Sequence, residues 1–149
     1  MKFAVSVTGV KEIDSVLKAL PAAVSHKVLG AAHLAAAKPL IQRETQLAPI
    51  LSGDLSESIG GEKTPISRAN AVGEVVVGPR RSRQHRGYHG HLVERGTKRR
   101  VNKKGANRGV MPAHPFIQPA FDQTHIQVEK NIALEVGKSV WRTMKRYLK

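Results

Sequence analysis

The segment from Arg80 to Arg108 is the feature that most limits how this chain can fold. It holds eleven of the 25 Lys and Arg residues and a single acid, Glu94. Few apolar side chains separate these charges, so the segment cannot bury enough surface to offset the entropy of ordering it, and its charges repel one another. We therefore expect residues 79–111 to form an exposed, mobile basic loop or arm inserted in a folded body.

The chain as a whole has the size and composition of a single domain. It has 149 residues, of which 40% are hydrophobic and only 4% aromatic, so its core must come mainly from Ala, Val, Leu and Ile. The formal net charge is +14, and the basic segment supplies +10 of it (eleven basic residues less one acidic residue). A charge this local predicts one negative partner surface and argues against a uniformly cationic protein that coats nucleic acid.

Several classes of protein are excluded by what the sequence lacks. There is no Cys, which excludes disulfides, thiolate metal sites and Cys nucleophiles. No long apolar stretch follows Lys2, so we expect no signal peptide. No run reaches the roughly 20 apolar residues that a membrane span needs. We expect a soluble protein that is made in the cytoplasm and does not contact a membrane.

Periodicity predicts a strand and two helices in the first third of the chain. Phe3–Thr8 alternates as a short strand does, and Val10–Leu20 has helical spacing. An Ala-rich helix is expected over Ala22–Gln46, kinked or divided at Pro39 and ended by Ala48-Pro49.

The second half of the chain predicts a hairpin and a long helix. Leu55–Lys63 and Ala71–Gly78 are expected to pair as antiparallel strands across a loop at Thr64–Ala69. Within the basic segment, Leu92 and Val93 predict a brief helical turn or strand that docks on the body. The fold class is therefore α+β: a small, mostly antiparallel sheet packed against two long helices, with a long basic loop.

The last helix is expected from Ile117 to Leu148. Its apolar face is expected to pack against the Ala-rich face of the helix at 22–46. Apolar residues recur along the last helix at spacings near four. They are Ile117, Phe121, Val128, Ile132, Val136, Val140, Met144 and Leu148.

Five short phrases occur in a characteristic order along residues 3–125. They read VTGVKEIDSVLKALP, LAPILSGDLSESI, VVVGP, HLVERGT and MPAHPFIQPAFD. Together they resemble the HK97-type neck, or tail-completion, proteins of long-tailed phages. The stretches on either side of HLVERGT are more basic here than in that family pattern.

The resemblance implies a structural role in the virion. It implies a small α+β subunit in the neck or tail, assembled in the host cytoplasm and joining head to tail. The implied partners are further copies of the chain in a ring, expected to be a hexamer, the head connector, and tail-tube or tail-terminator proteins. It implies no enzymatic activity, no catalytic residues, no cofactor and no metal.

Several residues in these phrases are also expected, from their own chemistry, to form turns or to anchor segments in the core. Pro49 is expected to end a helix, and Gly53 to permit a tight turn in which Ser52 or Asp54 caps backbone amides. Gly96 is expected at positive φ. Pro115 and Pro119 are expected to hold an extended segment, while Phe116 and Phe121 insert into the core.

The basic side chains are the candidate partner-contact residues. Tyr88 is the one aromatic residue among them, which gives base stacking little support, so any contact with DNA is expected to be through charge alone. An acidic protein surface, the DNA backbone and no specific partner remain alternatives. The candidates are Arg80, Arg81, Arg83, Arg86, Arg99, Arg100, Lys103, Lys104 and Arg108.

The histidines and the single acid of the same segment raise the question of a metal site. The spacing of His85, His89, His91 and His114 around Glu94 matches no metal motif, so these residues are interpreted as solvated or subunit-contact side chains. Glu94 itself is expected to pair with Arg95 or with an Arg of a neighbouring subunit. The alternative function is a small basic protein that binds nucleic acid without sequence specificity.

Overall fold

The computed structural model describes residues 22–147, except for the side chains of residues 22–24, 144, 146 and 147. The expected strand at Phe3–Thr8 and the expected helix at Val10–Leu20 lie outside the described residues. None of the helices within residues 22–147 is both long and apolar enough to cross a membrane.

The first two helices are one Ala-rich stretch divided in two. Helix α2 spans Ala22–Ala36 and α3 spans Lys38–Leu47, so the division predicted at Pro39 is confirmed. Pro39 lies in the first turn of α3, where its missing N–H is not needed for a helical hydrogen bond. The end at Ala48-Pro49 is also as predicted, because Ala48 is already extended (ψ 131°).

A short helix and a two-stranded hairpin follow. Helix α4 (Asp54–Ser58) leads into β1 (Ile59–Lys63), which pairs antiparallel with β2 (Val75–Pro79). The predicted hairpin is confirmed, but the predictions that its first strand begins at Leu55 and its second at Ala71 are wrong, since the strands begin at Ile59 and Val75. Gly53 turns the chain at φ 85°, and acids in the first turn of α4 favour a helix there.

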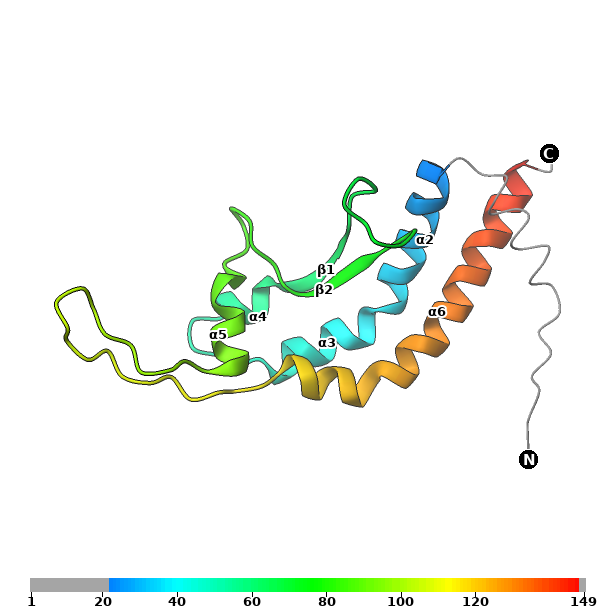
Figure 1. Cartoon of the computed structure of the whole chain (residues 1–149). Helices are drawn as coiled ribbons and strands as arrows, with labels where there is room; N and C mark the ends of the chain where they lie inside the picture. Colours follow the sequence, from blue (N-terminus) through cyan, green and yellow to red (C-terminus); the bar gives the residue numbers. More distant parts are fainter. Residues whose placement is uncertain (1–21, 148–149) are drawn as a thin grey trace, which may run out of the picture.

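The elements form three layers. Helices α2 and α3 pack on one face of the hairpin, and α6 (Ile117–Tyr147) runs along their other side (Figure 1). The approach to the sheet is close, since a Cβ at Gly61 would collide with the side chain of Leu34. The α+β class is therefore confirmed, as is the predicted contact of the Ala-rich helix with the last helix.

Two buried or half-buried histidines of α2 hold the loop between the strands. His26 Nδ1 accepts a hydrogen bond from the N–H of Gly73 (3.1 Å), so its Nε2 is the protonated nitrogen that donates to the carbonyl of Thr64 (2.7 Å). His33 Nδ1 lies 2.7 Å from the carbonyl oxygen of Gly73 and donates to it. These histidines are structural, and the sequence reading did not single them out.

The packed face of α6 differs from the predicted stripe at its beginning. Phe121 is 49% exposed, so its expected insertion into the core is wrong, whereas Phe116 is fully buried. The small residues Ala120 and Thr124 are buried here instead, and Phe121 faces outward. Pro119 is helical, in the first turn of α6, so the expected extended role holds for Pro115 but not for Pro119.

Candidate docking site for a negatively charged partner

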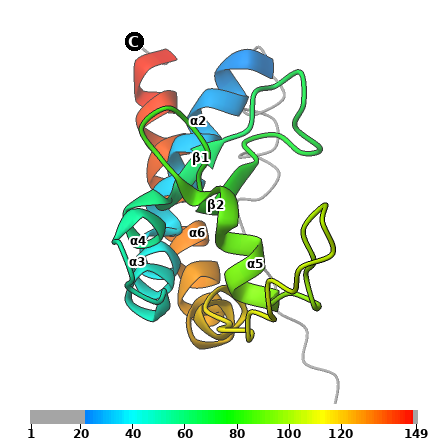
Figure 2. The same cartoon turned by 90° about the vertical axis from the view of Figure 1, so that its left-hand side faces the viewer.

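The basic segment is divided by a small docked helix. A 3-10 turn, η1 (Gly87–His89), leads into α5 (Gly90–Arg95), where Val93 is 5% exposed. The brief docked turn predicted at Leu92 and Val93 is therefore confirmed, and the exposed parts of the segment 79–111 lie on either side of residues 87–95. Two hairpins remain on either side of α5, which we call the short hairpin (residues 80–87) and the long hairpin (residues 97–111) (Figures 1 and 2).

The long hairpin is held by a ladder of backbone hydrogen bonds. The N–H of Thr97 donates to the carbonyl of Met111 (2.9 Å), and the N–H of Arg100 donates to that of Gly109 (3.1 Å). The N–H of Arg108 then donates back to the carbonyl of Arg100 (2.7 Å). These bonds give backbone N–H and C=O groups partners without burying apolar side chains, so a segment poor in apolar residues can still form a hairpin.

The tip of the long hairpin is shaped by two asparagines. Asn102 Oδ1 accepts hydrogen bonds from the N–H groups of Lys104 (3.0 Å) and Ala106 (2.8 Å). Asn107 Oδ1 accepts one from the N–H of Gly109 (2.9 Å). Both side-chain oxygens are therefore engaged within the hairpin itself, as in Asx turns.

Glu94 connects the base of the long hairpin to the long helix. Its carboxylate accepts hydrogen bonds from the N–H groups of Phe116 (2.7 Å), Ile117 (2.9 Å) and Gln118 (3.2 Å). These are donors at the start of α6 that have no partner within the helix. The main partner of Glu94 is therefore the N-terminus of α6. No ion pair with Arg95 forms within residues 22–147, although the charge of Arg95 also helps to lower the pKa of Glu94. The expected contact with an Arg of a neighbouring subunit stays a prediction.

The pKa of Glu94 reflects this arrangement. Desolvation by burial acts to raise it, but the backbone hydrogen bonds from Ile117, Phe116 and Gln118 outweigh that effect and hold the pKa below its ordinary value. The carboxylate is therefore charged at neutral pH, where it also interacts favourably with the helix dipole.

Further hydrogen bonds near Glu94 fix the base of the long hairpin to α5. The N–H of His114 donates to the carbonyl of Val93 (2.8 Å), and the N–H of Met111 donates to Thr97 Oγ1 (3.0 Å). Gly96 has φ 69°, as predicted, and a Cβ there would lie 2.7 Å from the carbonyl oxygen of Met111. The phrases HLVERGT and MPAHPF are therefore two halves of one structural unit.

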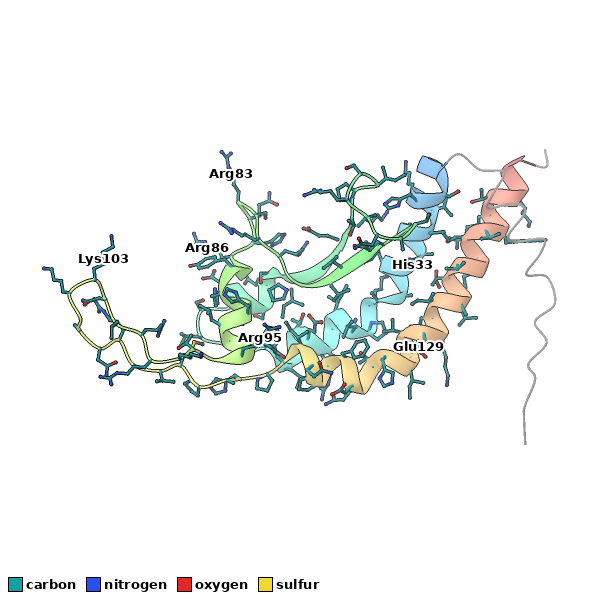
Figure 3. All side chains as sticks on the ribbon, in the orientation of Figure 1. His33, Arg83, Arg86, Arg95, Lys103 and Glu129 are labelled. Atoms are coloured by element: carbon teal, nitrogen blue, oxygen red, sulfur yellow. The ribbon has the colours of Figure 1, made fainter. Side chains whose placement is uncertain are left out.

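Most of the predicted contact residues are exposed and lack an internal partner. Within residues 22–147, none of them forms an ion pair. Arg83 and Arg86 extend from the short hairpin and Lys103 from the tip of the long one (Figure 3). Arg80 is the exception, because it is half-buried and its Nε donates to the carbonyl of Ser58 (3.1 Å). The exposed members are Arg81, Arg83, Arg86, Arg99, Arg100, Lys103, Lys104 and Arg108.

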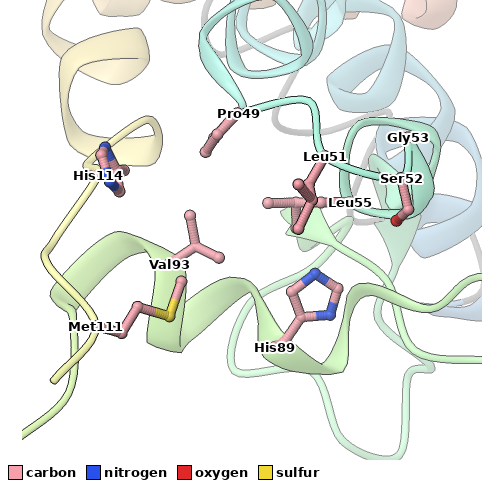
Figure 4. A pocket seen from close by; sticks show the side chains of 9 residues that line it. All are labelled: Pro49, Leu51, Ser52, Gly53, Leu55, His89, Val93, Met111 and His114. Atoms are coloured by element: carbon pink, nitrogen blue, oxygen red, sulfur yellow. The ribbon is translucent and has the colours of Figure 1, made fainter. Parts of the chain in front are cut away.

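An apolar groove of about 200 Å³ lies beside the base of the long hairpin (Figure 4). Leu55, Val93 and Met111 line it, and Leu51 at its rim is fully exposed. This volume is below the roughly 300 Å³ at which small-molecule sites begin. Ser52, also on the rim, donates its hydroxyl hydrogen to Asp54 (3.0 Å).

The histidines around Glu94 do not form a metal site in the part of the chain that the structure describes. No group of three or more His, Asp or Glu side chains lies close enough there to hold an ion. His85 and His89 are half-buried, and His91 and His114 are exposed.

Glu44 is a buried acid that the sequence reading missed. It lies on the apolar face of α3 between Ile41 and Ala48, is 1% exposed, and its Oε2 has no hydrogen-bond partner. Burial, and then the charge of Glu94, raise its pKa to about 7. Its position three residues after Ile41 and four before Ala48 is the signal that would have identified it.

Glu44 is expected to make stability fall as pH rises from about 4.5 to 7. In that interval the folded state holds a proton on Glu44 that the unfolded state has released, so increasing pH favours unfolding. Glu44→Gln removes this slope, and the wild type should lose on the order of 3 kcal/mol relative to the variant across the interval. Urea denaturation over this range measures it.

The exposed Glu57 of α4 provides the control for that experiment. Glu57→Gln should retain the wild-type slope. A Glu44→Gln profile parallel to that of the wild type would show that Glu44 titrates normally.

Comparisons with known proteins add no family to these observations. No protein-family model, curated protein or solved structure matches the chain. The function is therefore argued from its residues and their geometry.

Proposed function

We propose that the protein is a structural subunit of a tailed-phage neck, which joins the head connector to the tail as part of an oligomeric ring. The observation that carries the proposal is the long hairpin, a projection whose base is fixed to the body and whose cations have no internal partner within residues 22–147. Such a projection can reach a negatively charged component outside the subunit. The protein partners of the subunit as a whole would be other copies of the chain, the connector, and tail-tube or tail-terminator proteins in the virion.

Exposed apolar side chains at opposite ends of the subunit support assembly into a ring. Ile50 and Leu51, before α4, are 80% and 101% exposed, and Trp141, late in α6, is 59% exposed. Helix α4 and the end of α6 lie at opposite ends of the described body (Figure 1). Contacts between unlike ends are heterologous, and heterologous contacts close into rings when the rotation between subunits permits it.

Oligomer formation by the purified protein tests the proposal. Negative-stain images and native mass spectrometry of the full chain, alone and with tail tubes, should show closed rings, with six copies expected. Leu51→Asp should abolish them, because a charge would then occupy an apolar contact. Ile66→Asp, at an exposed residue of the 64–74 loop, should leave them intact. A monomer that neither forms rings nor joins tails would refute the proposal.

A small basic protein that binds nucleic acid without sequence specificity is the second candidate. The observation that favours it is the same set of cations without internal partners. This candidate predicts a functional monomer with steeply salt-dependent binding and no association with tail tubes.

A further inference from the structure

We propose that the long hairpin binds the phosphate backbone of duplex DNA without reading its sequence. The inference deepens the proposed function and rests on it in one respect, since in a neck ring the duplex would be the packaged genome. Contact with DNA itself is argued from the hairpin.

The charge of the long hairpin is uncompensated. All six of its cations are exposed, and no acid occurs between Glu94 and Asp122. The carboxylate of Glu94 is already engaged by the start of α6. A partner with closely spaced negative charges would therefore meet no repulsion here, and binding would release its counterions. The six are Lys98, Arg99, Arg100, Lys103, Lys104 and Arg108.

The shape of the hairpin also suits a duplex. It is a hairpin that extends beyond α5, with one isolated antiparallel bridge between Val101 and Asn107 and with Lys103 at its tip (Figure 3). The major groove of B-form DNA admits a two-stranded ribbon, and a hairpin of this kind has a similar cross-section. Cations on both strands and at the tip can then reach phosphates on either side.

The hairpin offers little for base recognition. Asn102 and Asn107, the side chains that would bind adenine edges, use their oxygens to hold the turns of the hairpin. Residues 97–111 contain no aromatic side chain on which a base could stack. Lys and Arg remain, and their commonest role on DNA is to contact phosphate.

An acidic protein surface is the less favoured partner. Protein interfaces are usually anchored by aromatic or other large side chains that enter a pocket, with charges around them. The projecting part of the hairpin has only Val101 and Val110, each 62% exposed, and no large anchor. The hairpin therefore offers a partner mainly positive charge and little apolar surface.

Binding of full-length protein to a labelled duplex of about 30 base pairs tests the inference, measured by fluorescence anisotropy from about 50 to 200 mM salt. The hairpin variant carries Arg99→Gln, Arg100→Gln, Lys103→Gln and Lys104→Gln. If all four residues contact phosphate, the slope of log K against log salt should become shallower by about 3–4, with at least a tenfold loss of affinity at the lower salt. Duplexes of different sequence should bind equally.

A charge-matched variant separates the hairpin from the overall charge of the protein. It carries Lys27→Gln, Lys38→Gln, Lys130→Gln and Arg142→Gln, all exposed residues of helices. It should bind DNA like the wild type. Equal losses in the two variants would overturn the assignment to the hairpin. Thermal unfolding should be unchanged in the hairpin variant, because the four side chains have no partner in the fold.

The remaining outcomes distinguish this inference from the proposed function. Rings that form normally but do not bind DNA would overturn the inference and leave the neck proposal intact. Hairpin-dependent DNA binding by a protein that never forms rings would overturn the neck proposal and support the inference that the hairpin binds DNA. Hairpin-dependent binding to polyglutamate that exceeds binding to DNA would overturn the inference in favour of an acidic protein partner.

Discussion

Phe116→Ala is expected to lower the free energy of unfolding by about 3–5 kcal/mol. Phe116 is fully buried and belongs to a cluster with Ala48, Leu55, Ile59 and Val93, which come from four different segments of the chain. Truncating its ring removes the apolar contacts and leaves a cavity in the core. In a protein of ordinary stability, this loss is a large fraction of the whole free energy of unfolding.

Phe121→Ala provides the matched control for that loss. Phe121 is one turn further along α6, is 49% exposed, and stacks on His125 with ring centroids 5.5 Å apart. Its truncation should change stability by no more than about 0.5 kcal/mol, as is usual for surface positions. Urea denaturation of both variants gives the comparison, and equal losses would contradict the burial of Phe116.

Glu94→Gln is expected to destabilise the protein by about 1.5–3 kcal/mol, which is the second large effect. The substitution removes the negative charge that three N–H groups of α6 share, and an amide can present only one oxygen to them. The matched control is Glu129→Gln, at an exposed position of the same helix, which should have little effect.

The loss from Glu94→Gln should depend on pH in a defined direction. Because the pKa of Glu94 is lowered on folding, its stabilisation is fully present above its ordinary value near 4.5 and disappears as pH falls through the folded value. The difference between variant and wild type should therefore be largest near neutral pH and shrink in acid. A difference that stays constant down to strongly acidic pH would mean that the charge of Glu94 is not what supports α6.

The helices and the strand pair were predictable because their signals are local. The division near Pro39, the end at Pro49 and the beginning of the last helix all follow from residues within one turn of the boundary. The start of the first strand was misjudged because Gly53 and two nearby acids favour one turn of helix, which a reading by alternation alone does not detect.

The sequence predicted which residues form the candidate site, but it did not predict the backbone structure that holds them. The density of charge correctly identified exposed cations, yet it gave no indication that backbone pairing would order them. The cap by Glu94 joins residues more than twenty positions apart, and no local pattern specifies such a partner. Phe121 was misjudged for a related reason, since the face that α6 turns inward depends on the helices it packs against.

Because the long hairpin is held to the body only at its base, the sequence of its outer part can change without affecting the fold. Thr97, Gly96 and Met111 secure the two ends, and no residue from Arg99 to Val110 enters the core. Insertions, deletions or grafted sequences near Lys103 should leave the body folded while they change the length and charge of the hairpin. About a dozen residues can thus be rewritten without disturbing the fold of the protein.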